Sequence, residues 1–211
     1  MKNNKNIFLI GGGEIANGET KDIDKIIVQS AARDSSFVFF GAAAGDAEGY
    51  GDAIIEIFGD YFNVTIATEA KGLAHAEEAI NNASVIYLGG GNTELLMNLF
   101  KKWDLVKLLQ KAAVRGAIIV GMSAGAQALS SWFIHEEDGR QEIRKGWGVI
   151  SDNISILVHA TKISFDDAKK ISLDAEQKSN YQIYGIEERA AIKLDVDASD
   201  LEFIGKGRVW S

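Results

Sequence analysis

The sequence has no cysteine and no proline, and no apolar run in it is long enough to span a membrane. Without cysteine the chain can form no disulfide, offers no thiolate to a metal and has no thiol nucleophile. A membrane-spanning helix needs about 20 apolar residues, and the opening MKNNKNIFLIGGG also lacks the long apolar core of a signal peptide. We therefore expect a cytoplasmic protein that has no membrane partner and binds no metal or other cofactor.

Positive charge is also scarce. The chain carries 22 Lys and Arg against 30 Asp and Glu, which gives a formal net charge of −8. Because nucleic acids and anionic membranes attract basic surfaces, this balance argues against both as partners. Hydrophobic residues make up 46% of the 211 positions, which is enough for one large core. We expect a single α/β domain over residues 1–211, monomeric or homodimeric, whose partner is a small molecule.

Apolar runs alternate with helical patterns along the first 132 residues. This alternation predicts a doubly wound, mainly parallel sheet with helices on both faces. The predicted strands of this part are Asn6–Ile10, Ser36–Phe40, Asn63–Thr68, Ser84–Leu88 and Ala117–Val120. After Trp132 the pattern loosens, and Phe133–Lys145 is polar and charged. Farther along, we expect a helix over Asp166–Gln177 and strands at Ile154–His159, Tyr181–Ile186, Ala190–Leu194 and Leu201–Ile204, the last two as a candidate antiparallel pair.

One stretch, Ala117–Trp132, joins an apolar run to a helical pattern of small residues through the pentapeptide GMSAG at positions 121–125. A Gly-x-Ser-x-Gly pentapeptide between a strand and a helix is typical of a nucleophile elbow, which presents its serine at the carboxyl edge of a sheet. Ser123 is therefore the candidate nucleophile, and the Ala124 N–H is a candidate donor to an oxyanion. The alternative is a glycine-rich turn whose serine has no chemical role.

Two glycine-rich loops follow predicted strands. The later one, GGGNT at positions 89–93, offers Gly90 or Gly91 as a second oxyanion donor. The earlier one, GGGEIA at positions 11–16, matches a G-x-G-x-x-A dinucleotide fingerprint. In that fingerprint the glycines open a helix directly, whereas the helical pattern here begins only near Ile23. We therefore interpret the earlier loop as a longer connection over the sheet edge, either structural or facing a substrate.

A serine nucleophile needs a base, and the chain has three histidines. His159 ends the apolar stretch ISILVH, which places its ring at the sheet edge where Ser123 is expected. His75 and His135 lie in charged segments that are typical of solvated surface residues. His159 is therefore the predicted base, and the alternative for it is a packed or half-exposed residue at a strand end.

The base in turn needs a carboxylate to orient its ring. Three acidic residues, Glu136, Glu137 and Asp138, lie between the candidate serine and histidine, which gives the chain order found in α/β-hydrolases. We favour Asp138, because the Gly139 that follows it lets the chain turn back toward the sheet edge. The alternative is that all three carboxylates lie on a solvated loop.

Six motifs occur in a recognisable order: IGGGEI (10–15), GDAEGY (45–50), YLGGGNT (87–93), GMSAGA (121–126), GWGVI (146–150) and the strand that ends in His159. Together they resemble the peptidase E and cyanophycinase-like serine peptidases, family S51. The resemblance covers nearly the whole chain, and the combination of GGGNT with SAGA is fairly specific. It implies a fold like that of the class I glutamine amidotransferases.

The resemblance implies that Ser123 is the nucleophile and His159 the base, with the third triad member on the run Glu136–Asp138. It also implies that the GGGN loop supplies an oxyanion donor and that Asn92 contacts the substrate. The chain departs from the family around the base, where it has VHAT at 158–161 instead of the frequent Pro-His-Tyr-Asp. The arginines that often follow that motif are absent.

The sequence thus predicts a serine peptidase of the dipeptidase E type that acts on short peptides, with α-aspartyl dipeptides as the leading substrates. An acidic first residue needs a nearby cation, for which the candidates are Arg140, Arg144, Lys162 and Arg189. If these are solvated surface charges, the pocket takes a neutral residue instead. A rival from another class is an inert, amidotransferase-like module that uses the sheet and the glycine loops to hold a small metabolite.

Overall fold

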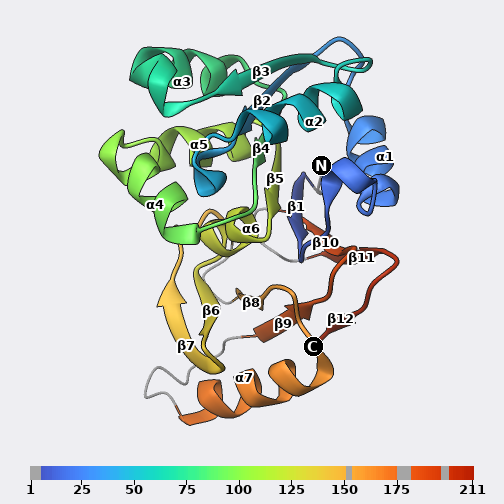
Figure 1. The fold of residues 1–211 in the computed structure, drawn as a ribbon, viewed down its shortest axis with the longest axis vertical. Coiled ribbons are helices and arrows are strands. Elements are labelled where there is room, and N and C mark those ends of the chain that lie inside the picture. The colour runs from blue at the N-terminus through green and yellow to red at the C-terminus, as the bar shows by residue number, and fades with distance from the viewer. Residues whose placement is uncertain (1–5, 151–153, 175–181, 196–199) are drawn as a thin grey trace.

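The structure is a computed structural model that describes residues 6–150, 154–174, 182–195 and 200–211. It contains a seven-stranded and a five-stranded sheet. The helices and strands of the first 130 residues gather around the seven-stranded sheet in the upper part of Figure 1. The five-stranded sheet lies below it, and the chain crosses back to the upper sheet near its C-terminus.

The seven-stranded sheet has the order β11-β10-β1-β5-β4-β2-β3. Neighbouring strands from β1 to β3 are parallel, whereas β10 pairs antiparallel with β1 and β11 antiparallel with β10. Strands β1, β4 and β5 are buried at every position, as apolar strands covered on both faces should be. The bounds are β1 (Ile7–Ile10), β2 (Ser36–Phe40), β3 (Asn63–Ala67), β4 (Val85–Leu88), β5 (Ile118–Met122), β10 (Ala190–Leu194) and β11 (Leu201–Gly205).

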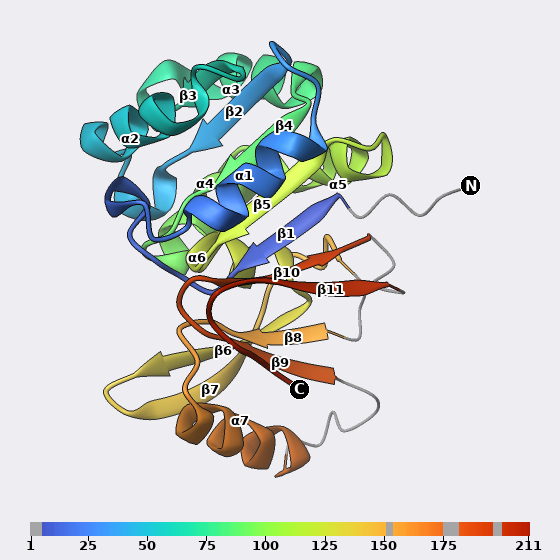
Figure 2. The same ribbon diagram turned by 90° about the vertical axis from the view of Figure 1, so that its right-hand side faces the viewer.

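Helices cover both faces of this sheet (Figure 2). On one face α1 and α2 bury Ile27, Ile54 and Phe58 against the strands, and on the other α3, α4 and α5 bury residues such as Ile80 and Phe100. This arrangement confirms the predicted doubly wound, mainly parallel fold. The helices are α1 (Lys21–Ser30), α2 (Glu48–Phe58), α3 (Gly72–Asn82), α4 (Thr93–Lys102), α5 (Val106–Val114) and α6 (Ala124–Leu129), with 3-10 helices η1 (Ile15–Asn17), η2 (Ala42–Ala44) and η3 (Glu69–Lys71).

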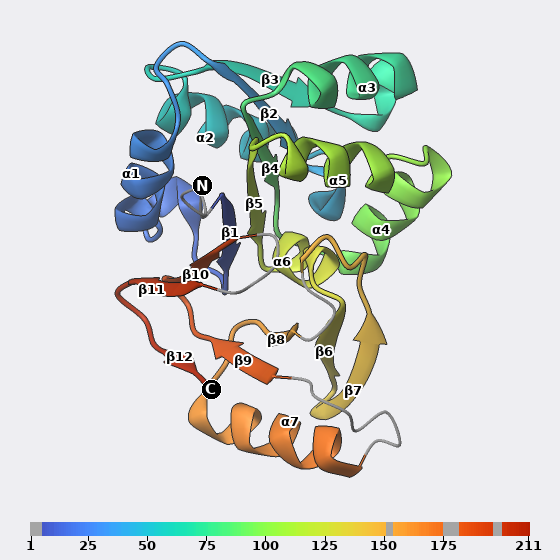
Figure 3. The same ribbon diagram turned by 180° about the vertical axis from the view of Figure 1, so that it is seen from behind.

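The five-stranded sheet has the order β12-β9-β8-β6-β7. Strands β6, β8 and β9 are parallel, and β7 and β12 pair antiparallel at its two edges. Helix α7 (Lys162–Asp174) lies against it, with Phe165 and Ala168 packed on Leu157 and Ile183 (Figure 3). The bounds are β6 (Trp132–Glu137), β7 (Arg140–Lys145), β8 (Ile154–Leu157), β9 (Gln182–Ile186) and β12 (Val209–Trp210).

The sequence-based prediction differs from the structure mainly in this second sheet. The polar segment after Trp132, for which no element was predicted, forms the β6–β7 hairpin. Helix α7 begins at Lys162 rather than Asp166, and the predicted helix end at Gln177 and strand start at Tyr181 lie outside the described residues. The predicted antiparallel pair of closing strands is confirmed as β10 and β11. Within the described ranges, no helix combines the length and the apolar character that crossing a membrane requires.

Candidate active site

Ser123 stands at the turn between the central strand β5 and helix α6. Its backbone has φ 49° and ψ −107°, a conformation that costs a non-glycine residue about 1–3 kcal/mol and that persists only where the surroundings enforce it. The close approach of helix and sheet is one such constraint, because a Cβ at Gly125 would lie 2.3 Å from the Leu88 carbonyl oxygen. The structure therefore has the predicted strand, sharp turn and helix around the serine.

His159 lies within hydrogen-bonding distance of the serine. Its Nε2 is 2.7 Å from the Ser123 Oγ, so the structure brings together the two residues that the sequence nominated as nucleophile and base. His159 follows β8 with φ 50°, an uncommon backbone for a histidine. Its backbone N–H donates to the Gly11 carbonyl, which ties this bend to the first glycine loop over 3.1 Å.

The carboxylate on the other side of the ring belongs to Glu188. Its Oε1 is 2.5 Å from His159 Nδ1, and the two side chains are 52% and 49% exposed. Glu188 lies in the turn between β9 and β10, and β10 begins beside the end of β1, where Ile10 faces Ala191. Because β10 runs antiparallel to β1, its first residue lies at the carboxyl edge of the parallel strands, the same edge as Ser123.

Asp138, the carboxylate favoured from the sequence, does not take this place. It forms the tip of the β6–β7 hairpin with Gly139, at φ 50° and 71°, between the paired residues Glu137 and Arg140. Two central residues with positive φ make a type I′ turn, for which Asp-Gly is one of the preferred sequences. Gly139, which we expected to turn the chain back toward the sheet edge, is thus half of a hairpin turn.

The other two predicted carboxylates have other neighbours. Glu136 accepts a hydrogen bond from Gln141 across the hairpin at 2.8 Å, and Glu137 lies 3.6 Å from His135. The sequence does contain a signal for this turn, because Glu187 and Glu188 are two acidic residues between the predicted strands Tyr181–Ile186 and Ala190–Leu194. The chain order of α/β-hydrolases directed the search upstream of His159 and away from this turn.

The first glycine loop supports the histidine and the glutamate. A Cβ at Gly12 would lie 2.5 Å from His159 Nδ1 and 2.7 Å from the Glu188 Oε2, so only a glycine leaves room for this pair. The Gly12 carbonyl also accepts from the Arg189 N–H at 3.0 Å. The loop therefore lies over the sheet edge as predicted, in contact with the residues beside Ser123.

The three predicted oxyanion donors, two in the second glycine loop and one at the start of α6, differ in whether their N–H groups are already hydrogen-bonded. The Gly90 N–H donates to the Tyr50 hydroxyl at 3.0 Å, so it is occupied. The N–H groups of Gly91 and Ala124 have no hydrogen-bond acceptor among the described residues. Asn92 caps helix α4, where its Oδ1 accepts from two backbone N–H groups at 2.8 and 3.2 Å.

Tyr50 and Tyr87 lie beside Met122, the residue that precedes Ser123. Both hydroxyls point at the Met122 sulfur, at 3.7 and 3.2 Å. Burial raises the pKa of Tyr50 to about 12 and raises that of Tyr87 well above its ordinary value, so both stay protonated. Tyr50 thereby links the end of β5 to the backbone of Gly90.

Two hollows flank Ser123 and His159. The first, which we name the Arg144 hollow, measures about 520 Å³ and is also lined by Asn92, Glu94, Gln127, Glu136 and Arg144. The second, the Tyr50 hollow, measures about 690 Å³ and is lined by Glu14, Glu19, Tyr50, Met122 and Glu188. Gly91 belongs to both. Both hollows therefore open onto Ser123 and His159.

Negative charge prevails in both hollows. Arg144 is the single Lys or Arg among the described residues that line them. Its guanidinium contacts Glu94 at 2.8 Å and also Glu142. Nowhere in the described ranges do three His, Asp or Glu side chains converge as metal ligands do.

Comparisons with known proteins identify the family and the fold. The family model described as "Peptidase family S51" matches residues 7–201. The "uncharacterized peptidase YgaJ" of Bacillus subtilis (strain 168) is 29% identical over 126 residues, which are 58% of this chain but only 55% of that relative. The chain thus matches about half the length of this curated relative.

Two solved structures share the fold. A peptidase from an acI-B1 actinobacterium superposes with a TM-score of 0.64 at 21% identity, over 96% of this chain and 88% of the other. A protein from Listeria monocytogenes EGD-e that is described as a peptidase E superposes with a TM-score of 0.68 at 20% identity, over 95% and 98%. At these identities the likeness concerns the fold alone.

Proposed function

The chain belongs to peptidase family S51, and from this membership we propose that it is a serine peptidase in which Ser123, His159 and Glu188 act as one catalytic triad. One observation carries the proposal. A continuous chain of hydrogen bonds runs from the Ser123 Oγ through both ring nitrogens of His159 to Glu188, over 2.7 and 2.5 Å. Acyl transfer by a serine needs this order of nucleophile, base and orienting carboxylate.

The reaction begins when the Ser123 Oγ attacks the carbonyl carbon of the substrate and its proton passes to His159 Nε2. Glu188 accepts a hydrogen bond from Nδ1–H, which fixes the ring tautomer and stabilises the imidazolium. The C–N bond breaks as Nε2 gives the proton to the leaving amine, and an acyl ester remains on Ser123. His159 then deprotonates a water molecule, which hydrolyses the ester and restores the serine.

The N–H groups of Ala124 and Gly91 are the proposed donors to the oxyanion. Ala124 follows Ser123 in the chain, and Gly91 lines both hollows beside it. Neither N–H is hydrogen-bonded within the described part of the chain. Donors that point at the developing negative charge stabilise the transition state more than the substrate, and each is worth about 10²–10³ in rate. Gly90, the third candidate from the sequence, is set aside because Tyr50 already accepts from it.

The proposed substrates are short peptides that lie across Ser123 with one end in each hollow. Preference for an acidic first residue depends on Arg144, since the other three candidate cations line neither hollow. An aspartyl substrate would have to displace the Arg144 contacts with Glu94 and Glu142. The remaining carboxylates of both hollows favour a neutral or cationic residue, so we propose that neutral residues are cleaved at least as fast as aspartate.

A fluorophosphonate probe tests the nucleophile. We expect one label per chain, on Ser123, that disappears in Ser123→Ala and persists in Ser36→Ala, a matched change of an exposed serine at the start of β2. Circular dichroism establishes that each variant is folded. Folded protein that takes no label would favour the inert metabolite-binding module over the peptidase.

A panel of Xaa-p-nitroanilides with Asp, Glu, Asn, Leu and Ala as Xaa tests the substrate preference. We expect Leu or Ala to be cleaved at least as fast as Asp. If Asp is the fastest, and Arg144→Ala removes that advantage, the α-aspartyl preference is correct and Arg144 provides the cation.

A further inference from the structure

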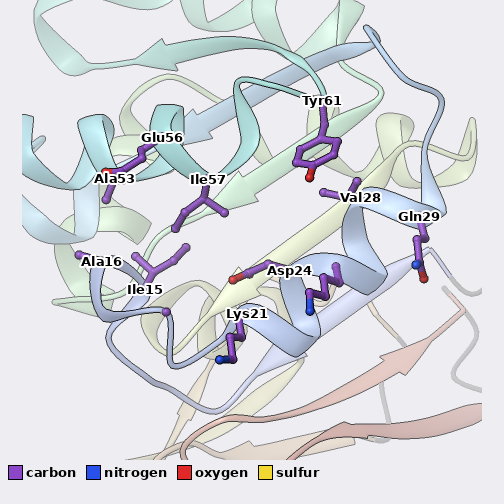
Figure 4. Close-up of a pocket in the computed structure, with 12 residues that line it drawn as sticks. Ile15, Ala16, Lys21, Asp24, Val28, Gln29, Ala53, Glu56, Ile57 and Tyr61 are labelled. Atoms are coloured by element: carbon purple, nitrogen blue, oxygen red, sulfur yellow. The ribbon is translucent and has the colours of Figure 1, made fainter.

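A third hollow lies between α1 and α2 (Figure 4), and none of Ser123, His159 and Glu188 lines it. It measures about 460 Å³, within the roughly 300–1,000 Å³ that is usual for small-molecule sites. Ile15, Val28, Ala53, Ile57 and Tyr61 supply its apolar lining. We name it the Asp24 hollow after its one buried charged residue.

Asp24 is the unusual residue of this lining. It is only 4% exposed, and its carboxyl group points from α1 toward Ile15 (Figure 4). The Oδ2 accepts from the Thr20 hydroxyl at 2.8 Å, but the buried Oδ1 has no partner. Burial raises the pKa of Asp24 to about 6, against an ordinary value of 3.8. A buried carboxylate oxygen without a donor is costly, and a ligand that brings a donor would satisfy it.

Two lysines of the same helix line the Asp24 hollow. Lys21 and Lys25 are exposed, so their ammonium groups stay in solvent while Asp24 lies deeper. Glu56 and Gln29, both exposed, also lie on the rim. The lining thus combines a buried carboxylate that lacks a donor, ammonium groups nearer the solvent, and an apolar wall. Their counterparts in a ligand are an ammonium group, a carboxylate and an apolar side chain.

We propose that the Asp24 hollow binds a free α-amino acid with an apolar side chain, such as leucine. The ligand ammonium group donates to the unpartnered oxygen of Asp24. The ligand carboxylate lies toward Lys21 or Lys25, and the side chain packs on Ile15 and Ile57. An apolar carboxylic acid would leave the buried Oδ1 of Asp24 without a donor, and a plain amine would bring no carboxylate for the lysines to contact.

The Asp24 hollow adjoins the Tyr50 hollow. Ile15, Ala16 and Ala53 line both, so the η1 loop separates a bound amino acid from the Ser123 side. Binding at Asp24 requires no peptide hydrolysis, and we expect Ser123→Ala to bind leucine as the unaltered protein does. The outcome is therefore independent of the proposed peptidase activity.

Calorimetric titration with leucine, 3-methylbutylamine and 4-methylpentanoate tests the proposal. The last two molecules keep the apolar group but lack the carboxylate or the ammonium group. We expect leucine to bind at least about tenfold more tightly than either, because each loses one charge-assisted contact. In Asp24→Asn we expect leucine binding to weaken by about tenfold or more, since the ammonium group loses its counter-charge.

Asp22→Asn is the matched control, because Asp22 lies on the same helix but pairs with Lys206 at 2.9 Å and does not line the Asp24 hollow. This variant should bind leucine within about twofold of the unaltered protein. Val28→Phe, which fills the hollow from α1 without a change of charge, should weaken binding as Asp24→Asn does. The proposal is overturned if leucine gives no binding at about 10 mM, if 4-methylpentanoate binds as well as leucine, or if Asp24→Asn leaves the affinity unchanged.

Discussion

The two sheets hold the candidate triad by different means. In the seven-stranded sheet, Ser123 follows β5, which is buried at every position and lies between β1 and β4. In the five-stranded sheet, His159 follows the four-residue strand β8 by way of a bend with positive φ. Glu188 belongs to neither sheet, since it lies in the turn that carries the chain from β9 back to β10. A packed core thus positions the candidate nucleophile, whereas turns position its two candidate partners.

The glycine loop after β1 connects these two parts. Gly11 accepts from the His159 N–H and Gly12 accepts from the Arg189 N–H, so one loop of the first sheet holds both partners of the serine. The proposed triad therefore needs residues from both parts of the fold at once. Neither part, alone, has the complete chain of hydrogen bonds.

The largest expected loss of turnover tests whether Ser123 and His159, which follow strands of different sheets, act together as one catalytic unit. Ser123→Ala and His159→Ala should each lower turnover of a cleaved p-nitroanilide by several orders of magnitude, and the double variant should be no worse than either. His75→Ala, which alters a histidine on α3 that lines neither hollow beside Ser123, should stay near the original rate. A single variant that keeps more than about a tenth of the turnover, worth only about 1.4 kcal/mol, would contradict the triad.

The next largest loss of activity is expected from a change of Glu188, the carboxylate in the turn between β9 and β10. Glu188→Gln should lower kcat by about 10²–10⁴, because the amide can favour the wrong tautomer of His159. Asp138→Asn should leave the rate unchanged, and asparagine also tolerates the positive φ of the hairpin tip. Parallel measurement of kcat for both variants separates the two assignments. The reverse pattern would restore Asp138 as the orienting residue.

The same difference between core and turns explains how far the sequence could be interpreted. The buried parallel strands are continuous apolar runs and the elbow at Ser123 carries a recognisable pentapeptide, and both were predicted within a residue or two. The β6–β7 hairpin is polar, so its period-2 pattern is weak, and its Asp138-Gly139 turn signal was assigned to catalysis instead. Glu188 could not be found from spacing, because its place depends on β10 returning antiparallel to β1.

The next prediction concerns the stability of the folded protein and Asp24, which lies on α1 beside the seven-stranded sheet. The folded-state pKa of Asp24, about 6, is above its ordinary value of 3.8, so the folded protein binds the proton more tightly than the unfolded chain. Stability from this group is therefore present at low pH and is lost as the pH rises from about 4 to about 6. Asp24→Asn, which stays neutral, should raise the free energy of unfolding by about 2 kcal/mol at pH 8 and by little at pH 4.

Urea denaturation of both proteins at the two pH values measures this difference. Asp22→Asn, on the exposed side of the same helix, should gain no stability at pH 8 because Asp22 already pairs with Lys206. An equal gain from Asp24→Asn at both pH values would mean that ionisation of Asp24 is not the cause. Turnover by Asp24→Asn should remain near the original rate, because none of the three triad residues lines the Asp24 hollow.

The smallest expected effect decides between the two neighbouring oxyanion candidates. Tyr50→Phe removes the acceptor of the Gly90 N–H and one partner of Met122, so the loop beside Ser123 loses a hydrogen bond worth about 1 kcal/mol. If Gly91 is the donor, kcat/KM should fall about three- to tenfold because the loop is held less firmly. If the freed Gly90 N–H instead serves the oxyanion, kcat should rise. Tyr61→Phe, outside both hollows that flank Ser123, is the control and should leave kcat unchanged.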